Sequence, residues 1–170
     1  MHFTKTSNGV FIASNAIVLG DVSVGEASSF WFGVVVRGDV AAVRIGRRVN
    51  VQDGSIIHCD SGVPNEIGDD VTIGHRATVH GMSVGSGTLI GMSATLLGRT
   101  KIGSECLIAA GAVVPPGLVV PDRMLVMGVP GRIVRQVNEE ELKYMRWLSG
   151  HYVKLAEKHV AGEFASFSRE

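Results

Sequence analysis

Residues 84–114 decide the fold: divided into sixes they read VGSGTL IGMSAT LLGRTK IGSECL IAAGAV, and Val114 opens the next group. An aliphatic residue begins each group, and a small residue stands four places after it. The same two columns extend back to Ile12, so the pattern covers about a hundred residues. A six-residue period kept through so many turns predicts a hexapeptide β-helix, which an ordinary β-sandwich would not require.

The period slips at three places along the chain. It gains three residues between Val36 and Ile45, gains four between Ile57 and Ile67, and loses one before Val84. We expect the two insertions to be loops that leave a corner of the β-helix. Loops on a rigid scaffold often carry function, and these two flank a group of histidines.

Three of the six histidines, His58, His75 and His80, lie in one short segment of the repeat. Three hexads would make one coil of a triangular prism, so His58 and His80 occupy the same place on neighbouring coils, roughly 4.8 Å apart at the backbone. Arg37 falls in line with them by the same count, whereas His75 falls on a different face. One chain therefore offers two imidazoles to one point, and a neighbouring subunit of a cyclic trimer is the best source of a third.

The overall composition excludes several classes of protein. Sixteen basic and sixteen acidic residues cancel, so there is no electrostatic case for binding nucleic acid. No apolar stretch is long enough to span a membrane, and the first residues lack a signal-peptide pattern. We expect a cytoplasmic protein. Cys59 and Cys106 form no disulfide framework.

The 170 residues suggest one domain with an appended helix. We predict a β-helix domain over residues 1–136, a helix over 137–160 packed on it, and a loosely ordered tail over 161–170. Asn138 should cap the helix, with Glu141 completing a capping box. Apolar residues then follow at helical spacing: Leu142, Met145, Leu148, Tyr152 and Leu155. The expected fold is all-β, a left-handed parallel β-helix of hexapeptide repeats with a C-terminal α-helix.

Several short motifs accompany the histidines. They are Arg37-Gly38-Asp39, Asn50-Val51-Gln52-Asp53-Gly54, Ile73-Gly74-His75, Val79-His80-Gly81 and Gly128-Val129-Pro130-Gly131. Over nearly its whole length the chain resembles the gamma-class carbonic anhydrase family, especially its bacterial branch of small proteins with a C-terminal helix.

The resemblance implies a homotrimer that holds a metal between subunits, with His58 and His80 from one chain and His75 from the next. The metal would be zinc or ferrous iron, because imidazole suits both. Three neutral imidazoles leave the charge of the ion uncompensated, so bound water ionises at a pH of about 7. The implied activity is that of a lyase: the metal-bound hydroxide attacks carbon dioxide, a small-molecule substrate, in a reversible hydration.

The resemblance also implies roles for residues around the metal. Gln52 would hydrogen-bond the metal-bound water, with Asn50 and Asp53 as its support. Arg37 and Asp39 resemble the pair that ties subunits together. Such second-shell groups are expected, because metal ligands need partners that hold them in place.

The chain departs from archetypal members of the family in two places. Val40 stands where they carry a glutamate, and the loop from Cys59 to Glu66 is shorter than their acidic loop, with Ser61 near the position of a glutamate thought to shuttle protons. Asp60 and Glu66 are the only carboxylates in this loop. Fast hydration needs a route for proton export, and the sequence leaves that route open.

Two other functions stay open at this point. A hexapeptide acyltransferase or thioesterase would bind an acyl-CoA in the groove between subunits and use one histidine as a base. A non-catalytic trimer would use the metal only to join subunits. Three protein ligands leave a zinc coordination position open, which is typical of catalytic sites rather than structural ones.

Overall fold

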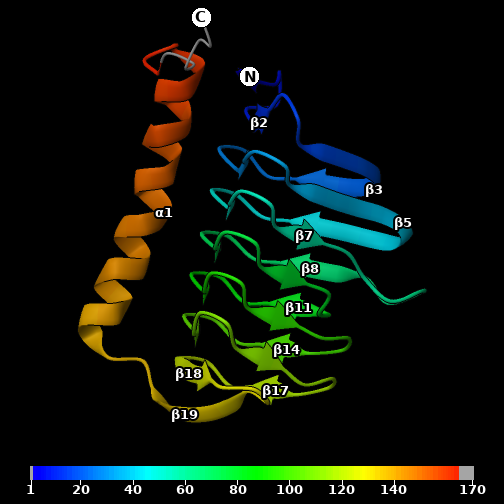
Figure 1. The fold of residues 1–170 in the computed structure, drawn as a ribbon, viewed down its shortest axis with the longest axis vertical. Helices are drawn as coiled ribbons and strands as arrows, with labels where there is room; N and C mark the ends of the chain where they lie inside the picture. Colours follow the sequence, from blue (N-terminus) through cyan, green and yellow to red (C-terminus); the bar gives the residue numbers. More distant parts are fainter. Residues whose placement is uncertain (1, 165–170) are drawn as a thin grey trace, which may run out of the picture.

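Short parallel strands form the three faces of a prism, and helix α1 (Glu139–Val160) runs alongside the stack (Figure 1). The computed structural model describes residues 2–164. The predicted β-helix fold is confirmed. The expected loose order of the 161–170 tail falls largely on residues 165–170, which lie outside the described range.

Each face is a ladder of strands from successive coils. Face I consists of β2 (Phe11–Ala13), β4 (Ser29–Phe30), β6 (Asn50–Val51), β9 (Thr72–Ile73), β12 (Leu89–Ile90), β15 (Leu107–Ile108) and β18 (Met124–Met127). Face II consists of the first halves of β3 (Ile17–Val24) and β5 (Val35–Ile45), then β7 (Ile56–Ile57), β10 (Thr78–Val79), β13 (Thr95–Leu96) and β16 (Val113–Val114). Face III consists of the second halves of β3 and β5, then β8 (Asn65–Ile67), β11 (Ser83–Val84), β14 (Lys101–Ile102) and β17 (Val119–Val120).

The repeated aliphatic residues point into the prism and form its core. On face II the pairing register runs from Val36 to Ile57, Val79, Leu96 and Val114, and all five side chains are fully buried. Stacking one aliphatic on the next removes apolar surface from water along the whole axis, which is the main stabilising contribution. The same register fixes which outward residues become neighbours.

The first insertion differs from the sequence prediction. The extra residues between Val36 and Ile45 do not form a loop, because they lie within the continuous strand β5, which pairs with β3 around the corner between faces II and III. The ladder shifts after Gly20 to accommodate them. Only the two ends of β5 pair with β3, at residues 35–38 and 43–45; between them the Val40 carbonyl accepts a hydrogen bond from the Gly62 N–H of the second insertion.

The second insertion is a loop, as predicted. It connects β7 to β8 and extends from the side of the stack (Figure 1). Within it the Val63 N–H donates to the Asp60 carbonyl at 3.0 Å, and the Gly62 N–H donates to the carbonyl of Val40 at 3.3 Å. The two insertions therefore contact each other beside the histidines.

Helix α1 begins as the sequence predicts. Asn138 is the N-cap and forms a capping box with Glu141. Leu142, Met145 and Leu148 are buried, while other apolar residues of the same stripe pack against the prism core. The helix contacts the strands of face I, and it covers that face.

Two antiparallel strands close the ends of the ladder on face I. β1 (Phe3–Lys5) pairs with β2, and β19 (Arg132–Gln136) pairs with β18. No helix in residues 2–164 is long and apolar enough to cross a membrane. The cytoplasmic location stays a prediction.

Candidate metal centre

The register of face II brings two of the predicted ligands together. Ile57 pairs with Val79, so His58 and His80, one residue later, lie side by side on neighbouring coils. The Nδ1 atom of His58 is 3.3 Å from Nε2 of His80. Arg37 follows Val36 in the preceding coil, in the same row. The arrangement that was counted from the sequence is therefore confirmed.

The separation of these two nitrogens fits a shared metal ion. Two nitrogens bound at about 2.0–2.1 Å to one tetrahedral zinc stand about 3.3–3.4 Å apart, and the measured distance between His58 and His80 is 3.3 Å. The same distance permits one N–H···N hydrogen bond when no ion is present. The donor set of the residues therefore fits zinc or ferrous iron.

Aspartates lie beside the other ring nitrogens of this pair, and the one beside His58 is within hydrogen-bond distance. Nε2 of His58 is 2.9 Å from Oδ1 of Asp39, and Nδ1 of His80 is 3.6 Å from Oδ1 of Asp60. A carboxylate on one ring nitrogen fixes the tautomer and orients the other nitrogen toward a metal. The ring nitrogens that have no aspartate beside them are Nδ1 of His58 and Nε2 of His80, and these two atoms face each other.

His75 has the same kind of support on another face. It lies two residues after Ile73 of β9, at the end of face I, and its Nδ1 is 2.8 Å from Oδ2 of Asp53. Within residues 2–164 no three His, Cys, Asp or Glu side chains come together as a metal-binding group in a single chain. The structure thus brings His58 and His80 together and keeps His75 apart from them.

Charge around His58 is balanced within the chain. NH1 of Arg37 is 2.6 Å from Oδ2 of Asp39. The hydrogen bond from His58 holds the pKa of the Asp39 carboxyl below its ordinary value, and the charge of Arg37 acts in the same direction. Asp39 therefore stays ionised at neutral pH and can act as a hydrogen-bond acceptor for the imidazole.

Of the two residues expected to support Gln52, Asn50 forms a hydrogen bond with it and Asp53 does not. The Gln52 Nε2–H donates to Oδ1 of Asn50 at 3.0 Å, and Asn50 in turn donates to the Thr72 hydroxyl at 2.8 Å. Asp53 instead pairs with His75 and accepts from the Phe32 backbone N–H. Asn50 and Gln52 are buried, so this network holds the Gln52 amide in a defined orientation.

Sequence reasoning missed the Asp60–His80 contact. Asp60 belongs to an insertion that interrupts the hexapeptide repeat, so counting the repeat could not predict which residue Asp60 contacts. A Cβ on Gly98 would lie 2.4 Å from Oδ2 of Asp60, which shows how closely the loop folds back over the next coil. Cys59 beside it is buried, which raises the pKa of its thiol and keeps it protonated.

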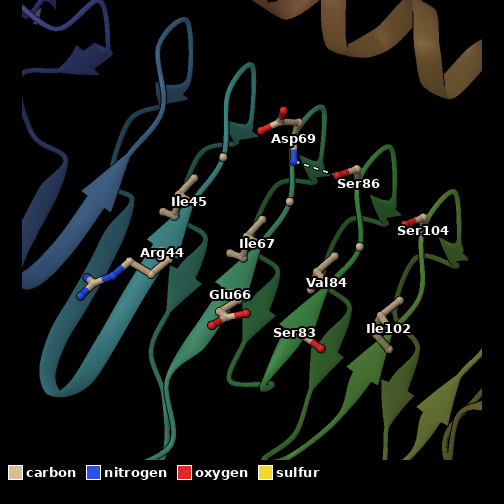
Figure 2. Close-up of a pocket in the computed structure, with 13 residues that line it drawn as sticks. Arg44, Ile45, Glu66, Ile67, Asp69, Ser83, Val84, Ser86, Ile102 and Ser104 are labelled. Carbon is tan, nitrogen blue, oxygen red and sulfur yellow. Dashed lines mark hydrogen bonds between the residues drawn. The ribbon is translucent and has the colours of Figure 1, made fainter.

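A surface recess on another face lacks this chemistry. About 550 Å³ in volume, it lies on face III, where Arg44, Glu66 and Ser83 follow one another on neighbouring strands (Figure 2). Arg44 is already paired with Asp21 at 2.6 Å. The described residues that line the recess include no histidine, so we do not assign the site there.

Comparisons with known proteins agree with the repeat. The family model described as "Bacterial transferase hexapeptide (six repeats)" matches residues 81–116, and "Hexapeptide repeat of succinyl-transferase" matches residues 64–97. A Methanocaldococcus jannaschii protein named "Probable carbonic anhydrase" is 46% identical over 89% of this chain and 95% of its own length. "Gamma carbonic anhydrase 2, mitochondrial" of Arabidopsis thaliana is 36% identical over 94% of this chain and 60% of its own length.

The chain belongs to the gamma carbonic anhydrase family. Among solved structures, a Bacillus cereus protein assigned as an acetyltransferase is 37% identical, with a TM-score of 0.88, over 92% of this chain and 91% of that one. Proteins with two different assigned activities are therefore similar to this member of the gamma carbonic anhydrase family. The choice between the activities depends on the residues of the site.

Proposed function

We propose that this protein is a metal-dependent carbonic anhydrase that hydrates carbon dioxide reversibly at sites between the subunits of a homotrimer. One observation carries the proposal: His58, His75 and His80 each have one ring nitrogen beside a different aspartate, which leaves the other nitrogen for a metal. Simple packing of histidines would not require a separate carboxylate for each ring.

The residues present would hold zinc or ferrous iron. When bound, such a metal supplies a Lewis acid that lowers the pKa of water to about 7. His58 and His80 would bind it from one subunit and His75 from the next. Asp39 holds the His58 ring by a hydrogen bond, and Asp53 and Asp60 lie beside the rings of His75 and His80.

Exposed apolar residues support a subunit contact at this position. Ile17, Leu19 and Ile56 on face II are 50%, 42% and 43% exposed, in the rows beside His58. Contiguous apolar surface of this kind is typical of protein interfaces. A neighbouring subunit that covered it would bring its own His75 toward the His58–His80 pair.

Gln52 would orient the reacting molecules. Its amide nitrogen donates to Asn50, and its carbonyl oxygen has no hydrogen-bond partner among the described residues. A fixed, buried amide can accept a hydrogen bond from the attacking water, and this positions the water for reaction. Gln52→Ala should therefore retain the metal and lower the rate of hydration.

A second candidate is acyl transfer or thioester hydrolysis with an acyl-CoA. The similarity to the Bacillus cereus protein assigned as an acetyltransferase favours it. A single histidine is enough for a general base, whereas this chain carries three histidines that each lie beside a carboxylate. The donor set therefore favours the metal-dependent activity.

The deciding experiment compares protein loaded with zinc, protein loaded with ferrous iron under anaerobic conditions, and metal-free protein. Carbon dioxide hydration should depend on the metal, and acetyl-CoA hydrolysis should be absent from all three. His58→Ala, His75→Ala and His80→Ala should each lose the metal, while His2→Ala, outside the repeat, should keep it. Full metal content in any of the three variants would sink the assignment.

A further inference from the structure

A recess of about 480 Å³ lies between helix α1 and face I, next to the candidate metal centre. Gln52 and His75 line one end of it. The remaining walls are mainly apolar, with leucine and alanine side chains from β12 and β15 and with Leu148 from the helix. Two tyrosines of α1, Tyr144 and Tyr152, complete the lining.

Three polar groups of this recess have no hydrogen-bond partner among the described residues. Gln52 is only 4% exposed, and it uses one amide hydrogen on Asn50. Neither its carbonyl oxygen nor the hydroxyl of Tyr144 or Tyr152 has a hydrogen-bond partner among the described residues. Tyr144 is 52% exposed, whereas the Gln52 side chain is buried and its carbonyl oxygen is free to accept a hydrogen bond, so this end of the recess can hold the polar head of a ligand.

The recess is larger than carbon dioxide requires. At about 30 Å³ for each water in the liquid, a volume of 480 Å³ corresponds to roughly sixteen waters, so the recess has room for a molecule much larger than carbon dioxide. Small-molecule sites usually have about 300–1,000 Å³ and a mostly apolar lining with a few polar groups. The apolar walls extend away from Gln52, so the body of such a molecule would lie along face I under the helix.

Charge around the recess favours a neutral ligand. Its described lining contains no Lys, Arg, Asp or Glu, so no cation is present to hold a carboxylate head. Burial raises the pKa of the Tyr152 hydroxyl, and the nearby negative charge of Asp53 acts in the same direction. The Tyr152 hydroxyl therefore stays protonated and can donate to a carbonyl oxygen.

We propose that the recess between α1 and face I binds a neutral small molecule with an unbranched aliphatic body and a primary amide head directed at Gln52. A primary amide donates and accepts hydrogen bonds, as the free groups of Gln52 and the tyrosines require. This inference goes beyond the proposed function and needs no bound metal.

The first experiment measures binding of acetamide, butanamide and hexanamide to the metal-free full chain by isothermal titration calorimetry. Burial of each added methylene should tighten binding roughly fourfold. Hexanoate should bind more weakly than hexanamide, because its charge would be buried without a cation. Equal affinity across the amide series would overturn the proposal, as would tighter binding of hexanoate.

Variants then test the position of the ligand. Ala109→Leu places a larger side chain in the recess, and Ala110→Leu does so at an exposed position that should not affect folding. Both should weaken hexanamide binding at least tenfold. Ser83→Leu is a matched control, because it adds bulk to an outward position of face III. Unchanged binding in both alanine variants would show that the ligand does not occupy this recess.

The head group and the metal centre can be tested separately. Gln52→Ala should weaken hexanamide binding roughly three- to tenfold, the effect of losing one hydrogen bond. The metal-free protein carries no ion at any interface, so hexanamide binding to it is measured independently of the metal centre. Unchanged hexanamide binding in Gln52→Ala would contradict the position assigned to the amide head.

Discussion

At the residue scale, the site consists of three imidazole–carboxylate pairs that come from different parts of the repeat. Counting hexads predicts that His58 and His80 are neighbours, because every coil repeats the same rows. Counting cannot predict the aspartate partners, because Asp39 and Asp60 lie in the two insertions, where the period fails. Asp53 could be assigned to the site from its motif, but its contact with His75 depends on the shape of a corner.

Asp60 provides the sharpest test at this scale. Asp60→Asn keeps the size of the side chain but removes the charge beside Nδ1 of His80. Loss of an outer-shell partner typically lowers metal affinity 10- to 100-fold, and we expect a decrease of about that size. Competition with a chelator measures the affinity.

The matched control for this substitution is Glu66→Gln. Glu66 is the other carboxylate of the loop, and its side chain lies on face III. Its metal affinity should equal that of the unaltered protein. If Asp60→Asn also binds metal as tightly as the unaltered protein, the Asp60–His80 contact has no part in the site.

At the element scale, the repeat predicts the strands well but not how they turn corners. β5 replaces a predicted loop, because β3 pairs with it on both sides of the corner, at residues 35–38 and at residues 43–45. Gly20 and Gly38 permit that pairing: a Cβ on Gly20 would lie 2.4 Å from the Gly38 carbonyl oxygen. The sequence does not reveal this contact, because a glycine in a loop and a glycine in a strand look alike.

Gly20→Ala should therefore destabilise the protein and disturb Asp39, which follows Gly38 in β5. Gly20 has a φ of +84°, so an alanine there is strained in addition to its clash with backbone. We expect a loss of several kcal/mol in the free energy of unfolding, as is typical of severe backbone conflicts. Urea denaturation measures this loss, and chelator competition measures the metal affinity.

Gly62→Ala is the control for Gly20→Ala, because it has the backbone strain of a positive φ without a steric clash. Gly62 has a φ of +72°, but a Cβ there meets nothing within 4 Å. This variant should lose only about 1 kcal/mol. Equal losses in the Gly20 and Gly62 variants would contradict the role assigned to the close approach of β3 and β5.

Helix α1 follows its sequence signals closely, from the cap to the buried stripe. Hydrogen bonds from Arg135 and from the Asn138 backbone N–H lower the pKa of Glu141 to about 2. Because this folded-state pKa lies below the ordinary value of 4.5, Glu141 contributes stability above about pH 5, and the contribution is lost as the pH falls toward about 2.

Glu141→Gln should therefore be less stable than the parent at pH 7, and the difference should shrink steadily between pH 5 and pH 2. Urea denaturation at several pH values measures it. Glu140→Gln, at an exposed position of the same turn, should show little difference from the parent at any pH. A gap between Glu141→Gln and the parent that does not change with pH would refute the linkage.

At the scale of the whole molecule, the prism separates the parts that one metal site needs. His58 and His80 lie at the end of face II, and His75 lies at the end of face I. The rigid stack of coils keeps the two groups apart, so motion within one chain cannot bring them together. In the proposed trimer, a cyclic arrangement of subunits would bring His75 of one chain to His58 and His80 of the next.

This separation predicts that two inactive variants should restore each other. His58→Ala and His75→Ala homotrimers each lack one ligand at every interface. The two variants are unfolded and refolded together. An interface is then complete if a chain of the His75→Ala variant supplies His58 and His80 and a chain of the His58→Ala variant supplies His75. Random mixing of equal amounts makes about a quarter of all interfaces complete in a cyclic trimer, so metal content and hydration activity should return to about that fraction. Native mass spectrometry verifies that mixed trimers have formed. If mixed trimers form and bind no metal, the ligands do not come from two chains, and the interface site is wrong.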